Sequence, residues 1–267
     1  AGDDATRLAA IERAAASGAD IAMIARGGYG LTRILPAINY KAVAKAIDKG
    51  TRFVGLSDFT AFQMALLAKT GAVTWAGPAV GEDFGTPDTP DDIMEACFDD
   101  LITGQGEGTG WTLPKTSAAD KPYQVKDAVL WGGNLAVLAS LVGTPYLPAI
   151  KGGIFYVEDV AEHPYRVERF MTQLLHAGVL ASQKAIIFGQ FSNYKLVPGY
   201  DSGFNMAAVV ARLQGQVKAR ILTGLPFGHV ATKVLLPVGM KTTLAVEGRD
   251  AFVLWGHLHA GGDGHHH

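Results

Sequence analysis

The chain has 267 residues, of which 48% are hydrophobic and 18% are charged, so it holds enough apolar material for one large domain or two smaller ones. Its formal net charge of −2 gives no electrostatic reason to expect a nucleic acid or an anionic membrane as partner. No apolar run approaches the roughly 18 residues of a membrane span, and a single cysteine, Cys97, excludes an intrachain disulfide.

The first part of the chain alternates helical and extended patterns. Apolar residues at helical spacing predict helices at 6–18, 31–38, 40–50, 59–71 and 91–102. Short apolar runs predict strands at 20–25, 52–55 and 72–77. Strands that alternate with helices form parallel βαβ units. We therefore predict an N-terminal α/β domain over residues 1–103, with a parallel, flavodoxin-like sheet.

Composition changes after this domain. Residues 104–126 are rich in Gly, Pro, Ser and Thr and have no sustained period, which predicts a linker. Beyond the linker, strands are predicted at 128–132, 153–160, 184–191, 219–228, 241–248 and 251–256, and helices at 134–143, 165–178 and 205–216. We predict a C-terminal mixed α/β, strand-rich domain over 127–260. The tail at 261–267, "GGDGHHH", is typical of a linker and purification tag, so its histidines are excluded from the chemistry.

A serine stands where a predicted strand gives way to a predicted helix, in "VGLSDFTAF" at 54–62. Serine is among the best residues for capping a helix, so the plain interpretation of Ser57 is a cap. Gly55 also matches the first half of G-x-S-x-G, the sharp turn that exposes a nucleophilic serine. Phe59 takes the place of the second glycine. The residues alone leave both interpretations open.

A glycine-rich turn, "ARGGYG" at 25–30, follows the predicted strand 20–25. Its spacing matches neither the dinucleotide-binding pattern nor the P-loop, so it does not favour nucleotide binding. The turn is either a tight strand-to-helix connection or a set of backbone N–H donors for an oxyanion. This turn and Ser57 both follow strands of the predicted parallel sheet, at the edge where such sheets bind ligands.

Further candidates lie in the second domain. Glu158 ends the predicted strand 153–160, and His229 follows a loop that contains glycine and proline. With Ser57 they occur in an order allowed for a serine triad, although a lone loop histidine is more often a surface residue. His257 and His259 could share one face of a strand and bind a metal, but no third ligand can be named. A serine hydrolase and a non-catalytic module that binds a small ligand both remain open.

Five segments together resemble the LD-carboxypeptidase family, also called the muramoyltetrapeptide carboxypeptidases. Each is modest alone, but together they stand in the family's order and spacing and cover nearly the whole chain. The segments are "ARGGYG" (25–30), "GLSDFTAF" (55–62), "WGGNL" (131–135), "EDVAEHPYRVER" (158–169) and "GLPFGH" (224–229).

The resemblance implies a role for each member of the triad. Ser57 matches the family's nucleophile and His229 its base. Glu158 matches the carboxylate that completes the triad, in preference to its neighbour Asp159.

The resemblance also implies groups that bind the substrate. The expected oxyanion hole consists of the backbone N–H groups of Gly28 and Asp58. The candidates for further substrate contacts are Gly27, Tyr29, Gly133 and Asn134.

The family's activity implies a cytoplasmic serine peptidase that cleaves an L,D peptide bond. It would release the terminal D-alanine of murein tetrapeptides in cell-wall recycling, with no metal or organic cofactor. The alternative within the family is an immunity-type peptidase that acts on peptidyl- or aminoacyl-nucleotides, but no aromatic residue that would stack on a base can be located. A homodimer is possible, but the sequence does not give the oligomeric state. Members of the family normally carry an upstream segment, so we expect the first sheet to lack its first strand or strands here.

Overall fold

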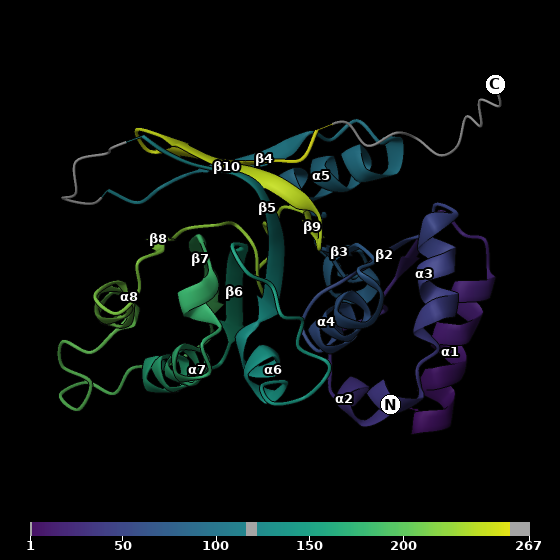
Figure 1. The fold of residues 1–267 in the computed structure, drawn as a ribbon, viewed down its shortest axis with the longest axis horizontal. Helices are drawn as coiled ribbons and strands as arrows, with labels where there is room; N and C mark the ends of the chain where they lie inside the picture. The colour runs from purple at the N-terminus through teal and green to yellow at the C-terminus, as the bar shows by residue number, and fades with distance from the viewer. Residues whose placement is uncertain (1, 116–121, 257–267) are drawn as a thin grey trace.

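A four-stranded sheet forms the first of two sheets in the computed structural model, which describes residues 2–115 and 122–256 (Figure 1). Its order is β1-β2-β3-β9; the first three strands are parallel and β9 is antiparallel to β3. The strands are β1 (Ile21–Met23), β2 (Arg52–Gly55), β3 (Thr74–Ala76) and β9 (Leu236–Val238). The helices of this part are α1 (Asp4–Ala16), α2 (Leu31–Ile34), η1 (Leu35–Ala37), α3 (Tyr40–Asp48), α4 (Phe59–Thr70), the π-helix η2 (Val80–Phe84) and α5 (Asp92–Thr103).

A seven-stranded sheet of order β4-β11-β10-β5-β6-β7-β8 forms the second part. Strands β5 to β8 run parallel, whereas β10, β11 and β4 are added antiparallel. The strands are β4 (Gly108–Thr112), β5 (Tyr123–Asn134), β6 (Ile154–Val160), β7 (Ala185–Ser192), β8 (Arg220–Leu222), β10 (Lys241–Glu247) and β11 (Asp250–Leu254). The remaining helices are α6 (Leu135–Ser140), α7 (Pro164–His176), η3 (Leu180–Ser182) and α8 (Met206–Gln214). The predicted fold class, a parallel-rich first sheet and a mixed second one, is confirmed.

The division between the two parts differs from the predicted one in two places. Within the predicted linker 104–126, residues 108–112 form β4, and β5 already begins at Tyr123. Strand β4 forms because it pairs with β11, which lies far along the chain, so its local composition gives no sign of it. Strand β9 of the C-terminal part joins the first sheet beside β3. The chain therefore crosses between the two parts again after His229.

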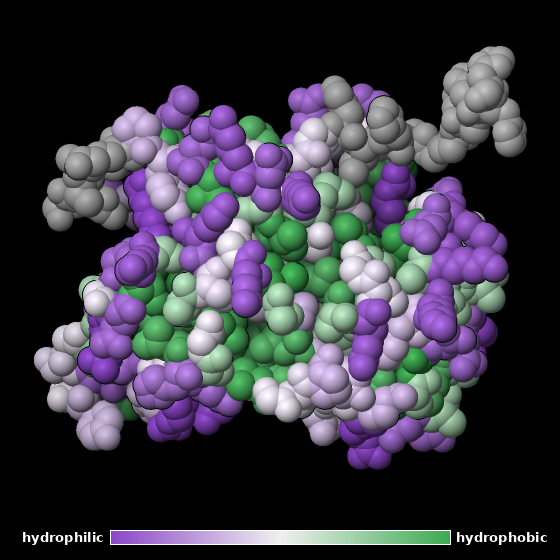
Figure 2. All heavy atoms as spheres, viewed as in Figure 1, coloured by the Kyte–Doolittle hydropathy of each residue, from purple (hydrophilic) through white to green (hydrophobic). Residues whose placement is uncertain are grey.

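Helix α4 lies where the two parts meet. All residues from Phe59 to Leu67 are buried, which is the pattern of a helix covered on every side. The helix packs against α6 and β5 of the second part as well as α2 and α3 of the first. One continuous apolar core consequently includes residues of both sheets. Figure 2 shows apolar residues gathered in the middle of one face of the molecule, with polar residues toward its margins.

Two sequence-based predictions fall outside the described residues: the metal-binding histidines, His257 and His259, and the tail 261–267. Within the part of the chain that the structure describes, no helix combines the length and apolarity needed to cross a membrane.

Candidate active site

Ser57 occupies a sharp turn between β2 and α4. Its φ of 66° lies in the left-handed region, which is uncommon for a residue other than glycine. Helix α4 begins at Phe59, and its N-cap residue is Asp58, which makes no side-chain cap bond. The hydroxyl of Ser57 is bonded to His229 instead, so the helix-cap interpretation of this serine is wrong.

Ser57, His229 and Glu158 form one chain of hydrogen bonds. Nε2 of His229 lies 3.0 Å from Ser57 Oγ, and Nδ1 lies 2.8 Å from Glu158 Oε2. An ionised carboxylate only accepts hydrogen bonds, so the Nδ1–H group donates to Glu158, and in the neutral ring Nε2 then accepts from the serine hydroxyl. This tautomer leaves Nε2 ready to take a proton from the serine.

The carboxylate of Glu158 is fully buried at the end of β6. Its second oxygen, Oε1, accepts a hydrogen bond of 3.4 Å from the side-chain amide of Asn134. The same amide donates to Asp159 at 3.0 Å, and the carbonyl oxygen of Asn134 caps α6 by accepting from Val137 N–H. Asn134 thus bridges two buried carboxylates, of which only Glu158 faces the histidine.

Two pKa values reflect this concentration of charge. Burial of the His229 ring opposes its charged form, but the hydrogen bond and charge of Glu158, together with the charge of Asp159, outweigh it and raise the pKa of His229. Burial also raises the pKa of Asp159 to about 6, although backbone N–H groups of Val160 and Ala136 stabilise its ionised form.

The glycine-rich turn 25–30 lies directly against Ser57. A side chain added at Gly27 would meet Ser57 Oγ at 3.1 Å, a tight contact that would push on the hydroxyl. The carboxylate of Asp58 fastens the turn, because it accepts a hydrogen bond of 2.9 Å from the N–H of Leu31 at the start of α2. Burial raises the pKa of Asp58, while the N–H groups of Leu31 and Gly30 lower it.

The backbone N–H groups of Gly28 and Asp58 donate to no acceptor among residues 2–115 and 122–256. By contrast, the N–H of Gly27 is occupied, because it donates to Oε1 of Glu82 at 3.2 Å. Both N–H groups are therefore available to an acceptor on a ligand, and their role as an oxyanion hole stays a prediction.

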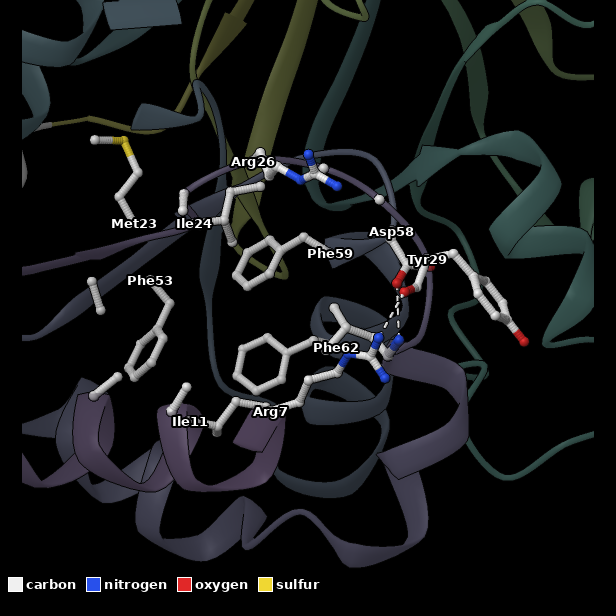
Figure 3. A pocket seen from close by; sticks show the side chains of 17 residues that line it. Arg7, Ile11, Met23, Ile24, Arg26, Tyr29, Phe53, Asp58, Phe59 and Phe62 are labelled. Atoms are coloured by element: carbon white, nitrogen blue, oxygen red, sulfur yellow. Dashed lines mark hydrogen bonds between the residues drawn. The ribbon is translucent and has the colours of Figure 1, made fainter. Parts of the chain in front are cut away.

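The remaining candidates for substrate contact differ in exposure. The ring of Tyr29 is 74% exposed and points away from the pocket drawn in Figure 3. Gly133 is buried, and a side chain there would strike Thr60 Oγ1 at 2.6 Å, so this glycine permits β5 to approach α4. Asn134 is 5% exposed, and its side chain is hydrogen-bonded to Glu158, Asp159 and the backbone of Val137. As substrate contacts, Gly27, Tyr29, Gly133 and Asn134 stay predictions.

A pocket of about 470 Å³ lies beside the glycine-rich turn, between α1, β1 and α4 (Figure 3). Its walls are mainly apolar and include Ile11, Phe53 and Phe62, with Arg7 and Asp58 at one side. None of the three triad side chains lines it. Among the described residues, no group of three His, Cys, Asp or Glu side chains has a metal-binding arrangement.

Family models match both parts of the chain. The model of the LD-carboxypeptidase N-terminal domain matches residues 1–77, and that of the LD-carboxypeptidase C-terminal domain matches residues 127–244. The chain belongs to the LD-carboxypeptidase family. The family models and several of the relatives are named as carboxypeptidases, so membership supports a hydrolase.

Relatives of this LD-carboxypeptidase chain include a putative carboxypeptidase of Streptomyces coelicolor, 32% identical over 91% of this chain and 75% of the relative. A probable murein peptide carboxypeptidase of Bacillus subtilis is 27% identical over 86% and 70%. The crystal structure of muramoyltetrapeptide carboxypeptidase from Oxalobacter formigenes superposes with a TM-score of 0.86 at 40% identity, covering 96% of this chain and 86% of that one. The microcin C7 self-immunity protein MccF of Escherichia coli is 25% identical over 84% and 70%.

Sequence reasoning did not find several residues that surround the triad. Glu82 and Asp83 lie on η2, and Lys233 lies in the loop after His229. Thr60 on α4 accepts a hydrogen bond of 3.0 Å from the backbone of Asn134. The acidic pair in "GEDF" is the one local pattern that could have pointed to these residues. The contacts themselves join segments far apart in the chain, so the sequence does not show them.

Proposed function

We propose that this protein is a serine LD-carboxypeptidase that uses Ser57 as nucleophile, His229 as base and Glu158 as the carboxylate that orients the base. The observation that carries the proposal is the hydrogen-bonded chain from Ser57 through His229 to the buried Glu158, found in a member of this family. Each group stands at the end of a strand or in the loop that follows one, where α/β sheets place ligands.

In the first half of the reaction, Ser57 Oγ attacks the carbonyl carbon of the scissile amide while His229 Nε2 takes the hydroxyl proton. Glu158 stabilises the imidazolium that forms. The negative charge on the carbonyl oxygen is held by the backbone N–H groups of Gly28 and Asp58. The intermediate collapses when His229 gives its proton to the leaving amine, and the acyl group stays on Ser57.

In the second half, water takes the place of the leaving amine. His229 accepts a proton from water as the water oxygen attacks the acyl carbon, and the same two N–H groups hold the oxyanion. Return of the proton to Ser57 Oγ releases the carboxylic acid and restores the enzyme.

The proposed substrate is a cytoplasmic murein tetrapeptide, from which the terminal D-alanine is released during cell-wall recycling. The support is that a muramoyltetrapeptide carboxypeptidase is 40% identical to this chain over 96% of its length, whereas the immunity protein MccF is 24% identical over the same share.

The test is to incubate the protein with a murein tetrapeptide ending in D-alanine and to measure free D-alanine. The matched control peptide ends in L-alanine. We expect D-alanine release by the wild type, little release from the control, and no measurable turnover by Ser57→Ala. A fluorophosphonate probe should label the wild type at Ser57 and should not label the variant.

Several outcomes would overturn parts of the proposal. Activity in Ser57→Ala would refute the nucleophile. Cleavage of aminoacyl-nucleotides with no release of D-alanine would favour the immunity-type peptidase. Binding of the tetrapeptide without turnover or labelling would favour a non-catalytic module.

A further inference from the structure

A buried ion pair joins the loop of His229 to the first part of the molecule. Nζ of Lys233 lies 2.7 Å from Oδ1 of Asp83, and the two side chains are only 4% and 5% exposed. The other carboxylate oxygen of Asp83 accepts from the N–H of Ala79 at 2.8 Å. Burying two charges costs much of what their attraction returns, so such a pair is weak evidence for stability and calls for another role.

Asp83 belongs to η2, which also contacts the glycine-rich turn. Its neighbour Glu82 accepts from the N–H of Gly27, and the N–H of Gly81 donates to Ala25 O at 2.8 Å. One π-helical segment therefore touches the turn beside the nucleophile and, through Lys233, the loop of the base. Single-turn π-helices are frequent at functional sites.

We propose that Lys233 is a positioning residue for the base: through Asp83 it fixes the loop of His229 against the first part of the molecule and holds a positive charge near the imidazole. The proposal rests on the proposed role of His229. It assigns to this ion pair the task of keeping the ring in place.

The charges around the ring explain why a cation is useful there. From β6, Glu158 and Asp159 favour the imidazolium, and they raise the pKa of His229 despite its burial. Lys233 acts in the opposite direction, and Asp83 partly neutralises it from η2. On the side of the elbow the ring meets the uncharged hydroxyl of Ser57. Without the cation, more of the enzyme would hold a protonated base that cannot accept the serine proton.

The test uses two variants with opposite expected effects. Lys233→Met combined with Asp83→Asn removes the pair without leaving an isolated buried charge, and Asp83→Asn alone leaves the cation unbalanced. The readout is the pKa of His229 from NMR titration of labelled histidine, with the signal assigned by its loss in His229→Gln. The pH profile of kcat/KM is the second readout.

We expect the double variant to raise the pKa of His229 and to move the acid limb of kcat/KM to higher pH with it. Asp83→Asn alone should lower the pKa of His229 and move the acid limb of kcat/KM to lower pH. The matched control is Thr232→Val, which removes the 2.6 Å hydrogen bond from Thr232 of the same loop to Asp91 without changing the charge of the loop. It should leave the pKa of His229 unchanged.

Unchanged pKa values in folded samples of both charge variants would overturn the proposal, as would an equal shift in Thr232→Val. The titration needs no turnover, so it decides the matter even if no substrate is cleaved. Activity that survives His229→Ala would instead refute the proposed function and would leave the titration result standing.

Discussion

At the scale of single residues, the sharp turn at Ser57, called the elbow here, forms although only the first glycine of G-x-S-x-G is present. The strained torsion lies at Ser57 itself, whose φ is 66°. Gly55 is needed for a different reason, because a side chain there would strike the ring of Phe59 at 2.6 Å. Phe59, which replaces the second glycine of the motif, stacks on Phe62 with ring centroids 5.1 Å apart. The aromatic residue therefore anchors the turn from the side of α4.

Strain at Ser57 predicts that Ser57→Gly is more stable than Ser57→Ala. Both variants lose the hydroxyl and its bond to His229, but only alanine keeps a Cβ in the left-handed region, at a cost of about 1–2 kcal/mol. The greater backbone freedom of unfolded glycine offsets roughly 0.5–1 kcal/mol of this. Urea unfolding should place the glycine variant above the alanine variant by a few tenths to about 1 kcal/mol. An alanine variant of equal or greater stability would show that the turn is unstrained.

The position of Glu158 predicts that Glu158→Gln lowers kcat less than His229→Ala does. His229→Ala removes the group that moves the proton and should lower kcat by roughly 10⁴–10⁶-fold. Glu158→Gln keeps the shape but loses the charge, so the expected loss is smaller, roughly 10²–10⁴-fold. The acid limb of kcat/KM should also move to lower pH, because the carboxylate raises the pKa of His229. A similar movement of the acid limb in Asp159→Asn, with no movement in Glu158→Gln, would contradict this assignment.

The sequence singled out the three residues that the structure joins by hydrogen bonds, because each lies in a short contiguous motif. It did not decide between Glu158 and Asp159 without the family resemblance, since adjacent residues of one strand differ only in the face they occupy. In the structure Glu158 faces His229, while Asp159 accepts from the backbone N–H of Ala136 at the start of α6.

At the scale of elements, α2 and the glycine-rich turn depend on one carboxylate. Asp58 accepts from the N–H of Leu31 and so joins the turn to the elbow. Loss of a side chain that satisfies a helix N-terminus costs about 0.5–2 kcal/mol. We predict that Asp58→Ala lowers stability by this amount and lowers kcat more than it raises KM, because the N–H of Gly28 is no longer held in place.

The control for this prediction is Asp58→Asn. Its side-chain oxygen still accepts from Leu31, so most of the stability and turnover should remain. Steady-state kinetics and thermal unfolding of the two variants separate the alternatives. Equal losses of stability and turnover in the two variants would mean that the charge of Asp58, and not its hydrogen bond to α2, supports the turn.

The elements that sequence patterns did not predict are those whose partners lie far away. The glycine-rich β4 is formed by its pairing with β11, and the short β9 contains Pro237 and completes the first sheet beside β3. Strand propensity depends on cross-strand neighbours, so a segment of this kind has no clear local signature. The longer periodic segments, such as α1 and α7, were predicted because each has a regular apolar pattern of its own.

At the scale of the whole molecule, the proposed nucleophile Ser57 and the proposed base His229 lie 172 positions apart in sequence and approach to 3.0 Å. Helix α4 and the continuous core tie the two sheets together beneath the site. The loop of His229 is held from both sides. Ser192 of β7 donates to His229 O at 3.3 Å, and Thr232 donates to Asp91 at 2.6 Å.

This arrangement predicts that stability and activity change in opposite directions as pH rises. The pKa of His229 is raised above its usual value near 6.5, so the folded state binds a proton at this ring more tightly than the unfolded chain does. The resulting stabilisation is fully present below pH 6.5 and is lost as pH rises through the folded pKa. Catalysis requires the neutral ring, so it increases over the interval in which this stabilisation is lost.

The last prediction follows from that opposition and compares wild type with His229→Gln. Glutamine keeps a polar side chain but cannot titrate, so the stability difference between the two proteins should depend on pH. We expect the wild type to have its largest advantage below about pH 6.5 and a smaller one at pH 8.5, measured as midpoints of thermal unfolding in one buffer series. The stability difference between Glu158→Gln and His229→Gln should depend less on pH, because Glu158→Gln lacks the charge that favours a protonated His229. A difference between wild type and His229→Gln that stays constant or grows with pH would mean that the Glu158–His229 pair does not favour the imidazolium in the folded protein.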